Sequence, residues 1–269
     1  MAEALLAEAQ LPRAQALSAL VGWNQTEADW QLFLRHGQVR ALDDGGPALP
    51  ATAAALRFDA RLAWISMVLV RPDRRRQGLA TELMRWAMRA AGRETVALDA
   101  TPAGREVYTR LGFRDAWGLA RWRLPAAPAG TAVPVRPLTE ADWLTVDALD
   151  AEAFGAPRPW LLRNFHARMP HAAFVAPGGF VLARDGHRLP QIGPLVAPDA
   201  ATALALLAAA QRAIGGLCLM DLRDDAPGIA AACAAAGAMR ERPFTRMTLG
   251  AALPGNAALG PLLAGPEFG

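Results

Sequence analysis

The sequence predicts an α/β (α+β) chain of two similar domains, each a mixed, partly parallel twisted sheet flanked by helices. Short apolar segments rich in β-branched residues alternate with amphipathic segments of helical period. The order strand, helix, strand recurs, and it requires crossover connections between parallel strands. The two halves share landmarks at an offset of about 125 residues, which indicates an internal duplication. The matched landmarks are Val70 and Val196, Pro72 and Pro198, Asp99 and Asp221, and Gly112 and Gly237.

The first domain is predicted to span residues 1–124. Its second helix begins after Thr26, an N-cap residue with Asp29 three positions later. Pro72 ends its longest apolar strand, because proline cannot donate a backbone hydrogen bond. Thr101 precedes a proline at the start of its last helix, which is a typical N-terminal pattern. The predicted elements are helices at 14–22 and 26–35, strands at 37–42, 51–58 and 61–70, a helix at 78–91, a strand at 94–100, a helix at 102–111 and a strand near 113–124.

A segment rich in proline, alanine and glycine, residues 125–134, is predicted to link the first domain to the second, which covers residues 135–250. The tail, residues 251–269, holds many glycines and prolines and the single charge of Glu267. We therefore expect it to be irregular, either docked on the protein or disordered. The predicted elements of the second domain are a strand at 133–137, helices at 139–153 and 158–167, strands at 172–177, 179–184 and 189–196, a helix at 199–214, a strand at 217–222, a helix at 226–236 and a strand near 239–249.

The composition is that of a globular protein. Hydrophobic residues make up 53% of the chain and charged residues 20%, which excludes a disordered polymer. No apolar run reaches the ~18 residues that would suggest a membrane span. The N-terminal residues lack a basic region followed by a long apolar stretch, so we expect no secretory signal and a cytoplasmic protein.

Several chemistries are excluded by residue type. Cys218 and Cys233 have no CxxC spacing, so they are expected to be buried thiols and not disulfide or zinc residues. The histidines show no metal-binding pattern, and no metal is expected. All basic residues are arginine; the absence of lysine excludes a P-loop and Schiff-base catalysis.

The strongest functional signal is the segment VLVRPDRRRQGLATELMRWAM, residues 68–88. An apolar strand ends here, turns through a glycine and begins a helix, so unpaired amides and the positive end of a helix dipole meet at one point. Such a point binds phosphate. Gly78 allows close approach of a ligand to the backbone, and Arg75 and Arg76 offer charge-assisted hydrogen bonds. The predicted phosphate-binding residues are Arg75, Arg76, Gln77, Gly78, Leu79, Ala80 and Thr81.

Two other interpretations of the arginine cluster are less well supported by the residues around it. A solvated basic loop would not need the small residues Gly78 and Ala80 at this spacing. Nucleic-acid binding would need a wider basic surface with interleaved aromatic residues, whereas this cluster is confined to residues 71–76. No nucleic-acid partner is therefore predicted.

The stretch from Arg75 to Ala80, RRQGLA, resembles the R/Q-x-x-G-x-G/A signature of the GNAT superfamily of acyl-CoA-dependent N-acetyltransferases. Tyr108 to Phe113 matches a second pattern of that family, Y-x-x-x-G-F. The resemblance implies that acetyl-CoA is the co-substrate and that the turn holds its pyrophosphate. It also implies a splayed strand whose free amides, at Val68, Leu69 and Val70, bind the pantetheine arm and polarise the thioester carbonyl.

The resemblance also implies two catalytic roles. Tyr108, the only tyrosine, would protonate the departing CoA thiolate; the alternative is an ordinary core ring with its hydroxyl at the surface. Asp99 is the candidate general base, and the alternatives are a carboxylate that caps a turn or pairs with arginine, or a chain of water molecules. The sequence departs from the family where Thr101 replaces a common cofactor-contacting asparagine, and its first strand is nearly missing.

The acceptor pocket is expected near the loop between the first two helices, which lines this pocket in the superfamily. The stretch GWNQTEADW resembles one in a tandem subgroup, so Trp23 and Asn24 are predicted to contact the acceptor. Trp64 and Ser66 are predicted to face the same cleft from their strand. For the two tryptophans, ordinary core packing is the alternative.

The second domain lacks the features of the phosphate-binding turn. The turn after Pro198 and Asp199 reads Ala-Ala-Thr-Ala-Leu, with neither glycine nor arginine, and this half has no tyrosine. We therefore predict a degenerate GNAT-like domain that binds no CoA and shapes the acceptor cleft or a homodimer.

The sequence thus predicts an N-acetyltransferase that moves an acetyl group from acetyl-CoA to a primary amine by direct attack in a ternary complex. The acceptor is expected to be a small molecule or a peptide. A catalytically weak acyl-CoA-binding regulatory module is the alternative.

Overall fold

The structure is a computed structural model that describes residues 2–269, with side chains from residue 4 onward. The chain divides into two compact units. The first runs to Leu98 and includes Gly186–Arg188 and Thr248–Ala252, and the second holds the remaining residues. Both are mixed α/β structures, which confirms the predicted fold class.

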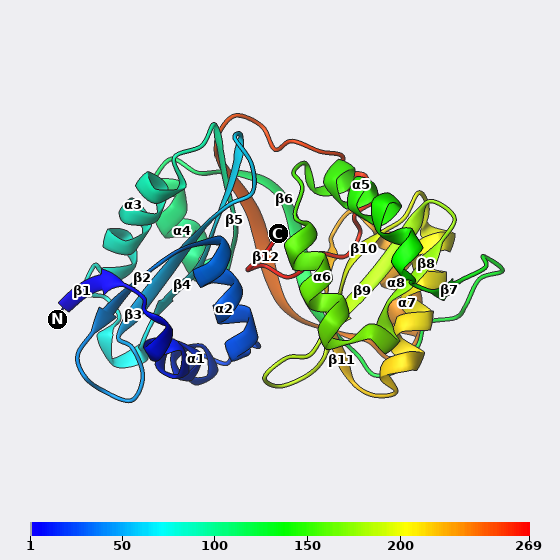
Figure 1. The fold of residues 1–269 in the computed structure, drawn as a ribbon, viewed down its shortest axis with the longest axis horizontal. Helices are drawn as coiled ribbons and strands as arrows, with labels where there is room; N and C mark the ends of the chain where they lie inside the picture. Colours follow the sequence, from blue (N-terminus) through cyan, green and yellow to red (C-terminus); the bar gives the residue numbers. More distant parts are fainter. Residues whose placement is uncertain (1) are drawn as a thin grey trace. The chain divides into compact units, whose positions relative to one another are not determined.

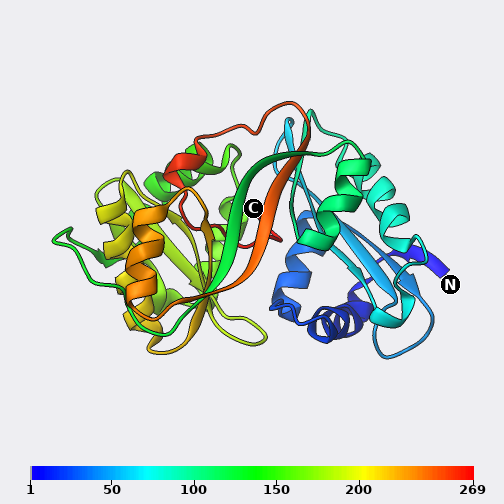
Figure 2. The ribbon, with the colours of Figure 1, turned by 180° about the vertical axis from the view of Figure 1, so that it is seen from behind.

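The first unit is built on a sheet with the strand order β1-β2-β3-β4-β5. The steps from β1 to β4 are antiparallel and the step from β4 to β5 is parallel. Helices α1 and α2 cover one face and α3 the other (Figures 1 and 2). The elements are β1 (Ala2–Leu5), α1 (Leu11–Leu20), α2 (Glu27–His36), β2 (Gly37–Asp43), β3 (Ala51–Arg57), β4 (Leu62–Val70), α3 (Leu79–Ala91) and β5 (Thr95–Ala100), of which Asp99 and Ala100 belong to the second unit.

The first strand corrects an expectation from the sequence. It is present as β1 and pairs with β2, from Ala2 opposite Asp43 to Leu5 opposite Arg40. The backbone amide of Leu6 continues the pairing by donating to the carbonyl of Val39 at 2.8 Å. A strand this short carries too few residues for its period to be recognised in the sequence.

The second unit has helices on both faces of its sheet, α5 and α6 on one face and α7 and α8 on the other (Figures 1 and 2). Its strands follow the order β12-β6-β11-β10-β9-β8-β7. The elements are α4 (Pro102–Arg110), β6 (Arg114–Leu124), β7 (Arg136–Pro137), α5 (Trp143–Phe154), α6 (Pro159–Arg168), β8 (Phe174–Ala176), β9 (Gly179–Arg184), β10 (Gln191–Val196), α7 (Ala200–Ile214), β11 (Cys218–Arg223), α8 (Pro227–Ala235) and β12 (Met239–Gly250), the end of which belongs to the first unit.

The two sequence repeats exchange their last strands. β6 closes the first repeat, yet its second half pairs with β11 of the second repeat, from Leu119 opposite Arg223 to Leu124 opposite Cys218. The end of β12 belongs instead to the first unit, where Thr95 Oγ1 donates to the carbonyl of Ala252 at 3.2 Å. The compact units therefore differ from the sequence repeats.

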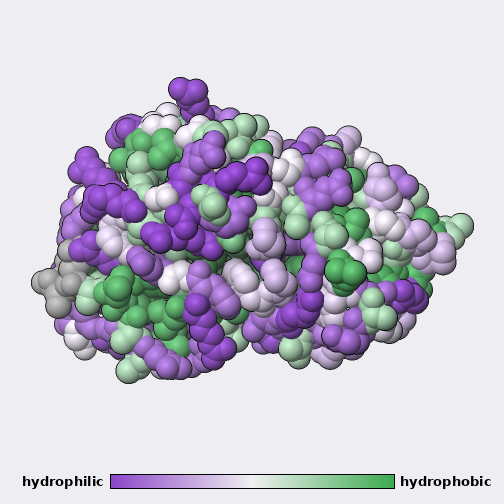
Figure 3. Space-filling view, turned by 45° about the horizontal axis from the view of Figure 1, so that its top comes forward, coloured by the Kyte–Doolittle hydropathy of each residue, from purple (hydrophilic) through white to green (hydrophobic). Residues whose placement is uncertain are grey.

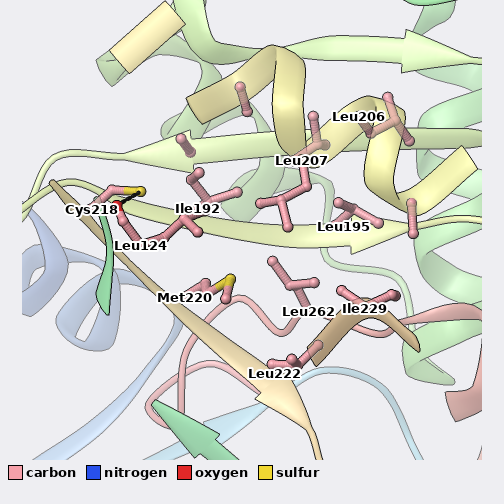
Figure 4. Packing of buried hydrophobic residues seen from close by; sticks show 14 of the residues in the cluster. Leu124, Ile192, Leu195, Leu206, Leu207, Cys218, Met220, Leu222, Ile229 and Leu262 are labelled. Atoms are coloured by element: carbon pink, nitrogen blue, oxygen red, sulfur yellow. Dashed lines mark hydrogen bonds between the residues drawn. The ribbon is translucent and has the colours of Figure 1, made fainter. Parts of the chain in front are cut away.

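The core of the second unit is apolar and includes both cysteines. Figure 4 shows Cys218 among its leucines and Ile192. Cys218 Sγ donates to the carbonyl of Leu124 at 3.5 Å. Burial raises the pKa of Cys218 to about 12 and that of Cys233 to about 11, so both remain protonated thiols at neutral pH. This confirms the prediction of buried thiols.

The surface mixes polar and apolar residues. On the face shown in Figure 3, hydrophilic residues alternate with smaller hydrophobic patches. Within residues 2–269, no helix combines the length and the apolar character that crossing a membrane requires.

Candidate functional site

The turn after β4 forms a run of unsatisfied backbone donors. A 3₁₀ turn, Pro72–Arg74, leads into Arg76 and Gly78, which both have left-handed backbone conformations with φ of 61° and 82°. Gly78 is the N-cap of α3 and supplies no side-chain cap. None of the backbone amides from Arg76 through Thr81 donates a hydrogen bond to a residue that the structure describes. This geometry suits a ligand with several acceptor oxygens.

The space above this turn is open. A Cβ built on Gly78 would meet no heavy atom within 4 Å. A ligand can therefore reach the amides, whereas the positive φ favours glycine over any other residue. Gln77 and Gly78 are exposed, Leu79, the first residue of α3, is buried, and Ala80 and Thr81 are half-buried.

The arginines of the turn divide into two roles. Arg71 and Arg74 both donate to Asp44 Oδ2, at 2.8 and 3.2 Å, and Arg71 also pairs with Asp73. The hydrogen bonds that Arg71 donates to Asp73 and Asp44 raise its pKa. These two arginines therefore hold the loop in place.

The other two arginines of the turn are exposed. Arg75 makes one long hydrogen bond, to the carbonyl of Val70 at 3.4 Å. Arg76 forms no hydrogen bond or ion pair with the residues described. Both guanidinium groups retain donors for an anion at the turn.

Strand β4 separates from its parallel neighbour before it reaches the turn. Its pairing with β5 runs from Leu62 opposite Thr95 to Trp64 opposite Ala97 and then stops. On the other side, the register with β3 shifts between Thr52 and Ala54, next to Met67, whose φ is 52°. Every second amide beyond Trp64 therefore points to an edge with no strand on it in the described chain. Val68, Leu69 and Val70 lie in this segment, and their contact with a pantetheine arm stays a prediction.

The predicted acceptor residues of the first unit have different environments. Trp64 is fully buried and Ser66 is nearly so. The hydroxyl of Ser66 has no hydrogen-bond partner among the described residues, and the same holds for Oε1 of buried Gln25. Buried polar atoms normally have partners, so a polar ligand or water would satisfy both. Gln25 was not predicted, although it follows Asn24 directly.

Asn24 holds a loop that comes from the second half of the sequence. Its Oδ1 accepts the amide of Arg188 at 2.9 Å, and its main-chain carbonyl accepts the amide of His187 at 2.8 Å. Asn24 is 1% exposed, whereas Trp23 beside it is half-buried. Nothing in the sequence pattern indicates this long-range contact.

Tyr108 lies in the second unit on α4, which Thr101 caps by accepting the amide of Gly104 at 3.2 Å. Tyr108 is half-buried, and the centroid of its ring lies 6.2 Å from that of Phe113. The ring also leaves no room for a side chain on Gly104, because a Cβ there would lie 2.9 Å from a ring atom. The Tyr108 hydroxyl has no hydrogen-bond partner in the described part of the chain. Burial raises the pKa of Tyr108 to about 12, so it is a proton donor at neutral pH.

The side chain of Asp99 is fully buried and paired with an arginine. Both of its carboxylate oxygens accept hydrogen bonds from Arg246, each at 2.8 Å. Burial raises the pKa of Asp99, although Arg246 opposes this effect. The structure thus shows the arginine pairing that the sequence left open, and a role for Asp99 as a base stays a prediction.

The equivalent turn of the second unit is acidic. Asp199 caps α7, and its Oδ1 accepts the amide of Thr202 at 2.8 Å. This amide lowers the pKa of Asp199, so a carboxylate occupies the helix end where the first unit offers free amides. A shallow cavity of about 240 Å³ beside it is lined by a second carboxylate, Asp225. Phosphate would meet repulsion here.

Metal ligands do not gather in the described chain. No group of three or more His, Cys, Asp or Glu side chains there has a geometry that could hold a metal ion.

Two family models match the sequence. Both describe an acetyltransferase (GNAT) domain, one over residues 35–115 and the other over residues 146–260. The chain belongs to the GNAT superfamily. It carries two GNAT domains in tandem, and the predicted linker, residues 125–134, lies between the two matched ranges.

Solved GNAT structures share this fold. A putative acetyltransferase from Pyrococcus horikoshii has a TM-score of 0.82 at 20% identity, covering 100% of this chain and 95% of its own. A tandem GNAT protein from the clavulanic acid biosynthesis pathway has a TM-score of 0.65 at 18% identity, with 92% and 98% covered. A GCN5-related N-acetyltransferase from Sphaerobacter thermophilus has a TM-score of 0.61 at 18% identity, with 94% and 97% covered. No curated protein matches the sequence significantly.

Proposed function

We propose that this tandem GNAT protein is an acetyl-CoA-dependent N-acetyltransferase whose first domain binds the coenzyme and whose acceptor is a primary amine. The observation that carries the proposal is the run of free amides from Arg76 through Thr81 on an open left-handed turn. Backbone amides at a helix N-terminus are the donors that a pyrophosphate requires. The neighbouring guanidinium groups of Arg75 and Arg76 add charge.

The free edge of β4 suits the rest of the coenzyme. Amides between Ile65 and Val70 can donate to the pantetheine arm in the manner of an added strand. Bound acetyl-CoA supplies the acetyl thioester. An amide of β4 that donates to the thioester carbonyl would hold the negative charge that develops on its oxygen.

The acceptor amine attacks directly in this proposal, because Ser66, the hydroxyl side chain described on β4, is not activated as a covalent relay. Ser66 is a hydroxyl without an adjacent histidine or carboxylate partner, so it is a poor nucleophile and a suitable acceptor contact. We assign Trp23 and Ser66 to contact with the acceptor. Trp64 is fully buried and both oxygens of Asn24 accept loop amides, so we assign these two residues to the framework of the acceptor pocket. Since Asp99 is held by Arg246, we assign removal of the amine proton to water molecules.

Tyr108→Phe is expected to reduce the rate of CoA release about 100-fold while leaving CoA affinity within about twofold, because general acids contribute roughly 10²–10⁴-fold. The substitution removes a hydroxyl that bonds nothing in the described chain, so the fold should be unaffected. Thiol release from acetyl-CoA with a panel of small amines and peptide N-termini measures the rate, and calorimetry measures affinity. Binding of CoA without turnover by the wild type would support the regulatory module instead.

The pH profile provides a separate test of Tyr108. A general acid acts when protonated, and the raised pKa of about 12 keeps Tyr108 protonated well above the usual tyrosine value of 10.0. The wild-type rate, corrected for thioester hydrolysis, should therefore not fall between about pH 8 and about pH 10.5. A descending limb in this range that Tyr108→Phe abolishes would show that the hydroxyl titrates normally.

A further inference from the structure

The second domain contains the same gap between parallel strands that the first domain uses in the proposed function. By the internal repeat, β10 and β11 correspond to β4 and β5. Their parallel pairing covers only Gln191 opposite Leu219 and Ile192 opposite Met220. The register of β10 with β9 then shifts before Leu195, as the register of β4 shifts beside Met67.

The C-terminal tail bonds the β10 side of this gap. The amide of Leu195 donates to the carbonyl of Leu262 at 3.0 Å, and the amide of Ala197 donates to that of Leu259 at 2.9 Å. These are amides of the strand that corresponds to β4, whose own free amides would hold the pantetheine arm. In the second domain, backbone carbonyls of the tail accept the hydrogen bonds of the corresponding amides.

The tail also bonds the β11 side. The amide of Arg223 donates to the carbonyl of Pro261, and the amide of Leu263 donates to the carbonyl of Asp221, each at 3.0 Å. Leu262 forms antiparallel bridges with both strands. The tail therefore closes the gap as a short inserted strand.

Apolar contacts fix this insertion. Leu262 is 1% exposed and lies among Leu195, Leu222 and Ile229 in the core of the second unit (Figure 4). A side chain at Gly193 would clash with the carbonyl oxygen of Leu263, so the glycine makes room for the tail.

Buried arginines hold the last residues. Arg158 Nη1 donates to the carbonyls of Phe268 and Gly269, at 2.9 and 2.8 Å, and its remaining nitrogens pair with Asp150. Phe268 is fully buried and packs edge-on against an aromatic ring of α6. Glu267 forms a buried ion pair with Arg184. The tail is thus docked, which answers the alternative that its sequence left open.

We propose that residues 259–263 occupy, in the second domain, the slot that the pantetheine arm takes in the first, so that the chain binds one coenzyme. The correspondence of the two slots rests on the proposed function. The seating of the tail rests on the hydrogen bonds and burial described above. Asp199, the N-cap of α7, supports the same conclusion, because its carboxylate would repel the pyrophosphate that must accompany a pantetheine arm.

Two measurements on the full-length protein test this proposal. Calorimetric titration with CoA should give one site per chain for the wild type. Gly78→Glu, which places a carboxylate on the turn of the first domain, should weaken binding at this site by about 100-fold or more. Hydrogen exchange should show the backbone of residues 191–197 and 259–269 exchanging at least about 100-fold more slowly than an unfolded peptide, with and without CoA.

The outcomes separate this proposal from the proposed function. Two CoA molecules bound per wild-type chain would contradict the proposal that the tail fills the slot of the second domain, and so would exchange of the tail at the rate of an unfolded peptide. A single CoA that Gly78→Glu binds with wild-type affinity would instead refute the assignment of the coenzyme to the turn after β4. No CoA binding by the wild type, together with a protected tail, would refute the proposed function but support the seated tail.

Discussion

Gly78→Glu is expected to weaken CoA binding by about 100-fold or more, roughly 2.7 kcal/mol, because it puts a carboxylate beside the pyrophosphate at the end of α3. The Cβ has open space, so the variant should fold. The substitution also places a non-glycine residue at a φ of 82°, which destabilises the fold by about 1 kcal/mol. Calorimetric titration with CoA measures the affinity, and thermal unfolding measures the effect on stability.

Gly215→Glu is the matched control. Gly215 is also exposed, has a φ of 71° at a helix end, and would give its Cβ only an ordinary contact, with the Arg212 carbonyl oxygen at 4.0 Å. It places the same charge, with a similar backbone strain, at the C-terminal end of α7 in the second unit. Equal losses of affinity in the two variants would show that the turn after β4 does not hold the coenzyme.

The bounds of β4 and α3 could be predicted from the sequence, because the residues that end the strand and begin the helix lie next to them in the chain. The strand predicted over 61–70 is observed as β4 over Leu62–Val70, and the helix predicted over 78–91 is α3 over Leu79–Ala91. Pro72 stops the strand and Gly78 begins the helix, so both signals lie within a few residues of the elements they bound. The free amides of the turn follow directly from this local geometry.

Long-range pairing could not be read in the same way, because residue patterns show which face is buried but not what covers it. The repeat offset matched Asp99 with Asp221, yet each aspartate pairs with an arginine of the other repeat, Arg246 and Arg121 respectively. The same exchange of strands places β6 beside β11.

The tail was unpredictable for a related reason. Its many glycines and prolines indicate irregular backbone, whereas its place in the core depends on Arg158 and on a gap between strands that only the fold creates. Composition identifies a segment that forms no regular element, but it does not tell whether such a segment docks.

Asp221→Ala is expected to reduce the free energy of unfolding by roughly 3–5 kcal/mol, because it leaves a buried guanidinium group without its counter-charge. Asp221 is fully buried, and its oxygens accept from Arg121 Nε and Nη2 at 3.0 and 2.8 Å. Oδ2 also accepts from Gln191 Nε2 at 2.7 Å, so the substitution removes the acceptor of this buried amide group as well. Denaturant unfolding measures the loss.

Asp224→Ala, three residues further on, is the control for Asp221→Ala. Asp224 pairs with Arg240 at 3.1 Å, but both side chains are 47% exposed, so its loss should change stability by no more than about 1 kcal/mol. Because the penalty at Asp221 comes from the stranded charge, Asp221→Ala combined with Arg121→Met should recover most of the lost stability. Equal effects of Asp221→Ala and Asp224→Ala, or no recovery in the double variant, would contradict this account of the exchanged strands.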